Sequence, residues 1–163
     1  MADIWQFYYK MVTDEWNIDN ALWVYSPSSG GPSYTSGVQT VVEPMYAYPG
    51  DDYVDIIGQD WYTSNATNYK FKTEGETEGN YESLMKPGKP TGICEFGYRG
   101  EEEYTAMDFL ETLKQMVNDG LKVSFFSTWT WTDSIFSMKK ADEFMNHEMI
   151  ITRDELLLRW NNN

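Results

Sequence analysis

Residues 54–62 read VDIIGQDWY, an apolar run with β-branched side chains that ends in an aspartate and two aromatic residues. This composition predicts a short buried strand. Three other stretches have the same character and are bounded by Gly, Pro, Asn or Asp: ALWVYS (21–26), TGICEF (91–96) and VSFFSTWTW (123–131). The four stretches begin at positions 21, 54, 91 and 123, a spacing typical of repeated strand–helix units and too wide for hairpins.

The segments between these strands carry helical patterns of uneven strength. The residues of segment 3–16 that share one apolar helical face are Ile4, Phe7, Tyr8, Met11 and Val12. Further helices are expected at 103–118, where NDG (118–120) is a stop signal, at 134–146, weakly near 81–85, and after the capping-box sequence TRDE (152–155). The stretch 27–53 is expected to be a long loop with at most a short helix near 38–45.

Strands that alternate with helices predict an α/β fold in which helices cover a parallel sheet. Four such units are half of a (β/α)8 barrel, and a complete barrel takes about 250 residues. The chain has 163 residues. We therefore predict a parallel (β/α) half-barrel of about four βα units, with residues 1–163 forming a single unit.

The charge and composition exclude several classes of partner. The chain has 12 Lys and Arg against 26 Asp and Glu, a formal net charge of -14. Such a charge repels phosphate backbones and anionic lipids, so neither nucleic acid nor membrane is an expected partner. Aromatic residues make up 17% of the chain. Rigid aromatic rings are suited to stacking on flat apolar ligand faces, including those of sugars.

Residue counts also limit the chemistry. The chain has one cysteine, Cys94, and one histidine, His147. These counts exclude an intrachain disulfide, a zinc site built from cysteines and a metal site rich in histidines. They also disfavour a Ser-His-Asp catalytic triad. No metal or other cofactor is expected. By strand alternation Cys94 is expected to point away from the face that carries Glu95.

In parallel α/β folds, functional residues gather at the carboxyl ends of the strands. The predicted strands end with two acidic residues, two phenols and several indoles: Trp23, Tyr25, Asp60, Tyr62, Glu95, Trp129 and Trp131. Carboxylates for bond cleavage beside aromatic planes favour a sugar site. The alternatives are structural: Glu95 could pair with an arginine such as Arg99, Asp60 could cap a loop, and the tryptophans could belong to the core.

Four motifs in this order and spacing resemble the carboxyl-terminal half of a glycoside hydrolase family 26 enzyme. They are NALWVYSP (20–27), YPGDDYVDIIGQDWY (48–62), KPTGICEFG (89–97) and VSFFSTWTW (123–131). The resemblance covers nearly the whole chain and implies strands five to eight of a (β/α)8 glycosidase. Most members of the family are endo-β-1,4-mannanases, so it also implies retaining hydrolysis of a β-1,4-linked, mannan-type polysaccharide, by an enzyme that is extracellular when complete.

Carried over by position, the resemblance implies that Glu95 is the catalytic nucleophile. Tyr62 would hydrogen-bond the Glu95 carboxylate and keep it ionised, and Trp129 would form the floor of the sugar subsite at the cleavage point. Further candidates for substrate binding are Asp60, Trp23, Tyr25 and Trp131.

The resemblance also implies that one of the two catalytic carboxyl groups is missing from the matched motifs. Retaining glycosidases use two carboxyl groups about 5–5.5 Å apart, and in this family the acid/base glutamate lies on strand four, which the matched motifs do not include. The chain alone is thus expected to be inactive or very weak. The rival hypotheses are a non-catalytic half-barrel that binds sugar weakly or serves only as a folding and assembly unit, and an unrelated α/β protein in which Glu95 is structural.

A half-barrel has two unpaired sheet edges and an uncovered inner face. Alternation predicts that this face includes Trp23, Ile56, Ile93 and Phe125. We therefore expect either a homodimer or a complex with a complementing half-barrel chain.

Overall fold

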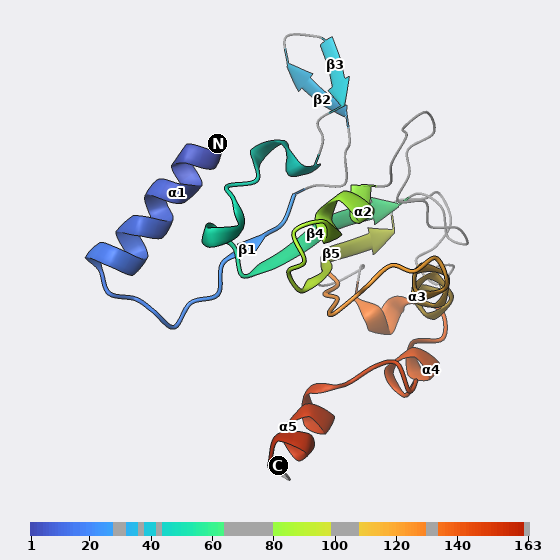
Figure 1. Cartoon of the computed structure of the whole chain (residues 1–163). Helices are drawn as coiled ribbons and strands as arrows, with labels where there is room; N and C mark the ends of the chain where they lie inside the picture. The colour runs from blue at the N-terminus through green and yellow to red at the C-terminus, as the bar shows by residue number, and fades with distance from the viewer. Residues whose placement is uncertain are drawn as a thin grey trace.

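The computed structural model describes residues 1–27, 32–35, 38–41, 44–63, 80–98, 108–129 and 134–161 (Figure 1). Its centre is a parallel sheet of three strands in the order β1 (Val24–Tyr25), β4 (Ile56–Thr63) and β5 (Thr91–Tyr98). Because all three strands run in the same direction and long segments connect them, the predicted parallel α/β arrangement is confirmed.

The fourth predicted strand lies parallel to β5 as an extended segment. The Ser124 N–H donates to the Thr91 carbonyl (2.8 Å), and the Ser127 N–H donates to the Ile93 carbonyl (2.8 Å). Within residues 121–129 the segment forms one isolated bridge, between Phe126 and Ile93. The close approach requires Gly92, because a Cβ at that position would overlap the backbone oxygen and ring of Phe125. Four chain segments therefore lie side by side, as the strand spacing predicts.

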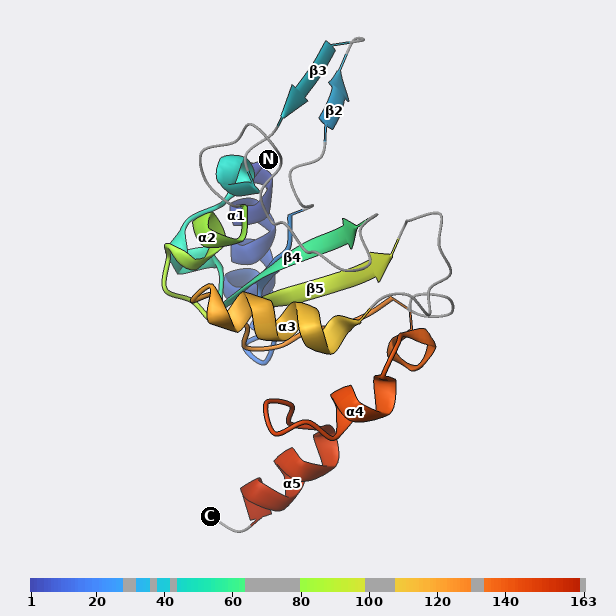
Figure 2. The same cartoon turned by 90° about the vertical axis from the view of Figure 1, so that its right-hand side faces the viewer.

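In the described part of the chain, four short helices follow β4 and β5, of which α2 and α3 lie beside the sheet and α4 and α5 lie farther from it (Figure 2). They are α2 (Asn80–Met85), α3 (Phe109–Asn118), α4 (Ala141–Met145) and α5 (Arg153–Asn161), with 3₁₀ turns at Pro44–Ala47, Asp51–Tyr53 and Ile135–Ser137. The start of α5 matches its predicted capping box, since the Glu155 carboxylate accepts the Thr152 N–H at 2.8 Å. No helix in the described ranges is long and apolar enough to cross a membrane.

The connection from β1 to β4 differs from the prediction. It contains an antiparallel hairpin of β2 (Pro32–Thr35) and β3 (Val38–Val41). The short helix expected near 38–45 is therefore wrong, apart from the 3₁₀ turn that begins at Pro44. The Tyr, Thr and Val residues in these two strands favour extended backbone, and pairing between the strands supplies the hydrogen bonds.

The larger core cluster lies between the sheet and α3, which runs alongside β5 (Figure 2). Phe109 of α3 is 1% exposed, and its ring centroid lies 4.3 Å from that of Phe96 and 5.3 Å from that of Phe144. Ile93 belongs to this cluster and is fully buried. The prediction that Ile93 faces the inner side of the half-barrel is therefore wrong.

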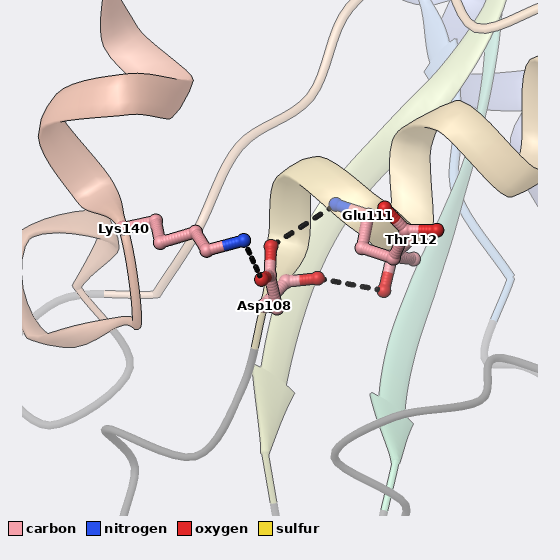
Figure 3. A network of polar contacts seen from close by, with 4 residues as sticks. All are labelled: Asp108, Glu111, Thr112 and Lys140. Carbon is pink, nitrogen blue, oxygen red and sulfur yellow. Dashed lines mark hydrogen bonds and ion pairs between the residues drawn. The ribbon is translucent and has the colours of Figure 1, made fainter.

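Asp108 connects the start of α3 with the start of α4 (Figure 3). Its side chain caps α3 by accepting the Glu111 N–H at 3.1 Å, and its other carboxylate oxygen lies 3.0 Å from Nζ of Lys140. Lys140 precedes α4 directly. One carboxylate thus begins α3 and holds the start of α4.

Helix α1 (Ala2–Lys10), which continues as a π-helix over Met11–Glu15, lies next to β1 at the end of the sheet opposite β5 (Figure 1). Nε1–H of Trp5 donates to the Tyr53 carbonyl at 2.9 Å, and Nε2 of Gln6 donates to the Pro49 carbonyl at 2.7 Å. The ring centroid of Tyr9 lies 5.2 Å from that of Tyr53. The face of α1 that contacts the rest of the molecule is thus the one carrying Trp5, Gln6 and Tyr9.

Candidate active site

Two predicted site residues meet on adjacent strands. Asp60 of β4 and Glu95 of β5 are opposite each other in the parallel register, and both lie in the carboxyl half of their strands. The pKa of the Asp60 carboxyl is raised, chiefly by burial and in smaller part by the charge of Glu95. The structure therefore brings these two carboxylates together on one edge of the sheet.

A β-bulge turns Glu95 toward this edge. Gln59 is paired with Ile93 and Asp60 with Glu95, so Cys94 is an extra residue on β5. Regular alternation would place Glu95 on the face of Ile93. Instead, Ile93 and Phe96 both lie in the helix-facing core, and Glu95 between them is partly exposed. Bulges next to functional sites commonly re-aim a side chain in this way.

Ser26, directly after β1, positions Asp60. The Ser26 hydroxyl donates to Oδ1 of Asp60 at 2.6 Å, and the Asp60 N–H donates to the Pro27 carbonyl at 3.0 Å. Burial raises the pKa of the Asp60 carboxyl above its ordinary value, the Ser26 hydrogen bond partly opposes the rise, and the Glu95 charge adds to it. Asp60 therefore binds a proton more readily than an ordinary aspartate does.

Cys94 lies with Ser26 and the carboxylates. A Cβ at Gly58 would overlap the Cys94 sulfur, and it would lie 3.4 Å from Oγ of Ser26. Burial raises the pKa of the Cys94 thiol, a hydrogen bond with Ser26 opposes the rise, and the charges of Asp60 and Glu95 add to it. The expectation that Cys94 points away from the face of Glu95 is therefore wrong, because the bulge changes the alternation.

The indole of Trp129 is available to a ligand. Its side chain is 53% exposed, and its backbone N–H donates to the Phe96 carbonyl at 3.4 Å, one residue beyond Glu95. Tyr62 is paired through its backbone with Gly97 of β5. The Tyr62 side chain and the whole of Trp131 lie outside what the structure describes, so the roles expected of both stay predictions.

The two other candidates lie in packed positions. Tyr25 is 7% exposed, and its hydroxyl donates to the Pro44 carbonyl at 2.6 Å. The ring centroid of Trp23 lies 5.8 Å from that of Trp5 on α1. Both side chains thus connect β1 with its surroundings, and the structure does not place them with Asp60 and Glu95.

The remaining polar candidates do not form a second site. Nδ1 of His147 accepts the Met149 N–H at 3.3 Å, far along the chain from the strand ends. Arg99, the possible structural partner of Glu95, falls outside the described residues. Among the residues that the structure describes, no group of His, Cys, Asp and Glu is arranged to hold a metal ion.

Sequence reasoning missed the roles of Ser26 and Cys94. The pattern Ile-Cys-Glu-Phe contains a usable signal, because apolar residues three apart, at 93 and 96, break the period of two that a regular strand requires. Ser26 carries no comparable signal, since its importance depends on the register between β1 and β4.

A parallel sheet with carboxylates and an exposed indole toward the carboxyl ends of its strands defines part of a (β/α) barrel that holds its chemistry at that rim. The chain belongs to glycosyl hydrolase family 26, whose family model matches residues 1–155.

The chain is similar to curated mannanases over a limited part of their length. It is 25% identical over 162 residues to the mannan endo-1,4-beta-mannosidase of Bacillus subtilis, covering 98% of this chain and 38% of that protein. It is 24% identical over 156 residues to mannan endo-1,4-beta-mannosidase A and B of Caldalkalibacillus mannanilyticus, covering 93% and 26% respectively. The chain thus spans well under half the length of these relatives.

Solved structures show the same fold. The Bacillus subtilis mannanase BCman superposes with a TM-score of 0.68 at 23% identity, covering 90% of this chain and 37% of that one. GH26A from Muricauda sp. MAR_2010_75 gives a TM-score of 0.61 at 22% identity, covering 94% and 43%. These likenesses show that the chain has the fold of part of a (β/α)8 barrel, and the family match assigns that fold to family 26.

Proposed function

We propose that this chain is the nucleophile-bearing part of a retaining β-mannanase, with Glu95 as the nucleophile. The observation that carries the proposal is the β-bulge that turns Glu95 out of the core and beside Asp60. The bulge leaves Glu95 partly exposed in the carboxyl half of its strand, where parallel α/β folds hold their functional residues. The curated relatives are named as mannan endo-1,4-beta-mannosidases, which favours a β-1,4-linked mannan as the substrate.

In this mechanism an oxygen of Glu95 attacks the anomeric carbon of a mannosyl unit. A Glu95–sugar ester forms as the glycosidic C–O bond breaks, and the leaving oxygen takes a proton from an acid. Water then attacks the same carbon and regenerates the Glu95 carboxylate. Tyr62 would donate a hydrogen bond to Glu95, which favours the ionised nucleophile, and Trp129 would stack on the sugar.

The proton donor of the first step is not assigned to this chain. Asp60 is the neighbouring strand partner of Glu95, and retaining hydrolysis requires an acid on the other side of the scissile bond, about 5–5.5 Å away. We therefore propose that the acid/base carboxylate comes from the part of the barrel that this chain does not match, and that the chain alone hydrolyses mannan very weakly.

An activated substrate tests the nucleophile without the missing acid. The 2,4-dinitrophenolate group leaves without being protonated, so the chain is expected to release it from the 2-deoxy-2-fluoro-β-mannoside in a burst and to retain the sugar on Glu95. Mass spectrometry of peptides locates the adduct.

Two variants show whether the burst depends on Glu95. Glu95→Gln is expected to abolish the burst, with a loss of several powers of ten in its rate. Glu143→Gln, an exposed carboxylate on α4, is the matched control and should react as the unaltered chain does. A burst that persists in Glu95→Gln would exclude Glu95 as the nucleophile.

The exposed Trp129 supports a second candidate function, sugar binding without hydrolysis. Mannohexaose should then quench the tryptophan fluorescence of the unaltered chain and of Glu95→Gln equally. Trp129→Ala should weaken binding, by about 1–3 kcal/mol if the sugar stacks as strongly as a nucleobase does on an aromatic side chain. Binding with no burst on the activated mannoside would favour this candidate over the first.

A further inference from the structure

The Ser26 hydroxyl, directly after β1, links that strand with both other strands of the sheet. It donates to Oδ1 of Asp60 on β4 at 2.6 Å, and it is also hydrogen-bonded to Cys94 on β5. Gly58 makes this approach possible, because a Cβ there would overlap the Cys94 sulfur and lie 3.4 Å from Oγ of Ser26. One hydroxyl thus reaches the candidate site from a strand that carries none of its carboxylates.

Two carboxylates that a ligand can reach lie side by side at this rim. Asp60 and Glu95 are opposite each other in the register of β4 and β5, and both are partly exposed. Burial and a neighbouring negative charge both disfavour an ionised carboxyl group. Both effects raise the pKa of Asp60, and the Ser26 hydrogen bond opposes them. The bond to Ser26 therefore extends the pH range over which the pair carries two negative charges.

We infer that Ser26 is a positioning residue whose hydroxyl orients Asp60 beside Glu95 in its charged form, and that the charge of Asp60 stabilises a cationic sugar at this rim. Glycoside hydrolysis passes through a transition state like an oxocarbenium ion, so the sugar ring gains positive charge as the leaving group departs. A fixed charge of opposite sign stabilises that state more than it stabilises the neutral substrate. The inference rests on the proposed function, to which it adds a second negative charge beside the nucleophile.

The Ser26 contact distinguishes this role of Asp60 from that of a proton donor. An acid must hold its proton until the bond breaks, whereas a hydroxyl that donates to a carboxylate favours loss of the proton. The 2.6 Å separation is typical of a hydroxyl that donates to an ionised carboxylate. The titratable groups that face this carboxyl in the described structure are Glu95 and Cys94 of β5, and Tyr81 of α2 is close enough to Cys94 for their charges to interact. None of these groups carries a positive charge, so among the described residues Ser26 is the one that favours the Asp60 anion.

A cationic sugar mimic tests the inference without requiring catalysis. The probe is isofagomine of manno configuration, a piperidine whose protonated nitrogen takes the place of the anomeric carbon, and mannobiose is the uncharged comparison. Between about pH 4 and pH 7 the amine stays protonated, and calorimetry of the full chain should show iminosugar affinity falling toward low pH as Asp60 gains its proton. Asp60→Asn should weaken iminosugar binding about tenfold or more at neutral pH and change mannobiose binding less.

Variants of Ser26 test its part in this binding. Ser26→Ala should move the fall in iminosugar affinity to higher pH by about one unit, the order expected when a carboxylate loses one hydrogen bond. Ser26→Thr retains the hydroxyl and should restore the profile of the unaltered chain. Tyr48→Phe is the matched control, since it removes a hydroxyl that donates to Oδ1 of Asp51 at 2.9 Å outside the candidate site, and it should change nothing. In an Asp60→Asn background, Ser26→Ala should have no further effect. Circular dichroism checks that each variant folds, and Asp60→Asn keeps the test decisive if Ser26→Ala does not.

The outcomes separate this inference from the proposed nucleophile. An unchanged pH profile in Ser26→Ala, or an iminosugar that binds no better than mannobiose, overturns the inference and leaves Ser26 as a link between β1 and β4. Equal weakening of both ligands in Asp60→Asn also overturns it, because the carboxylate then acts without its charge. Iminosugar binding that depends on Ser26 and Asp60, with no burst from the activated mannoside, keeps the inference and rejects Glu95 as the nucleophile. A burst without that dependence does the reverse.

Discussion

Asp60 and Glu95 face each other across two parallel strands because one extra residue, Cys94, shifts the register of β5. Without that bulge Glu95 would share the face of Ile93, which is fully buried against the helices. Two neighbouring carboxylates disfavour each other's ionised form. The raised pKa of Asp60 is in part a consequence of this pairing.

The pairing predicts how stability depends on pH. The pKa of Asp60 in the folded chain is raised, chiefly by burial. The folded state therefore binds more protons than the unfolded state between the ordinary aspartate pKa and the raised one, and stability falls as the pH rises through that window.

The substitution Asp60→Asn tests this dependence, because asparagine cannot ionise and its side-chain oxygen can still accept the Ser26 hydroxyl. We expect its melting temperature to exceed that of the unaltered chain at pH 7, with the difference shrinking as the pH falls toward 3. Asp55→Asn, whose carboxylate accepts the Trp23 N–H, is the control. An Asp60→Asn variant that is less stable at neutral pH would contradict the prediction.

The contact between Gly58 and Cys94 predicts a coupled pair of substitutions. In Gly58→Ala the new methyl group overlaps the Cys94 sulfur. Overpacking of this kind typically costs about 1–3 kcal/mol of unfolding free energy. Cys94→Ala in the same chain removes the sulfur and leaves a 3.1 Å approach to the Cys94 Cβ, so it should restore part of the loss. Urea denaturation of the two single variants and the double variant measures the coupling. Simple additivity would show that the two residues do not meet.

The strands that carry the candidate site could be predicted because their signals are local. Runs 54–62 and 91–96 are apolar, β-branched and bounded by turn residues, and they appear as β4 and β5 with boundaries shifted by at most two residues. Asp60 and Glu95 follow from these strands together with the rule that parallel strands end at a common rim. The roles of Tyr62 and Trp131 stay predictions.

The orientations of the other candidate side chains depend on tertiary contacts, which the sequence alone does not show. Whether Tyr25 faces a ligand or the core is set by Trp5 and Tyr48, whose rings lie 6.0 and 5.3 Å from its own. The apolar stripe of α1 is visible in the sequence, but whether that stripe is exposed depends on which other segments pack against it. The bulge at Cys94 is set by pairing with Gln59 and Asp60, and alternation alone gave the opposite side for the thiol.

The Asp108 contacts predict two separable contributions to stability. Asp108→Ala removes both the cap of α3 and the ion pair with Lys140, and loss of a cap typically costs about 1 kcal/mol. Asp108→Asn retains a capping oxygen and loses the charge. Because Lys140 is exposed, its ion pair is expected to contribute less than the cap. Thermal unfolding should therefore rank Asp108→Ala below Asp108→Asn, with Lys140→Gln close to Asp108→Asn. Equal losses for Ala and Asn would show that the cap contributes nothing.

Gln59 predicts a stabilising substitution in the core. Its side chain is fully buried, and within the described structure neither Nε2 nor Oε1 has a hydrogen-bond partner. An unsatisfied buried polar group typically costs about 1–3 kcal/mol. Methionine has a similar shape and adapts to irregular packing, so Gln59→Met should raise the unfolding free energy by part of that amount. Gln115→Met, at a partly buried position of α3, is the comparison and should change the unfolding free energy by less than Gln59→Met does. Gln59→Glu should destabilise the chain increasingly as the pH rises, because a buried carboxylate without a partner must stay protonated. Loss of stability in Gln59→Met would instead show that the amide binds an ordered water or a residue beyond the described ranges.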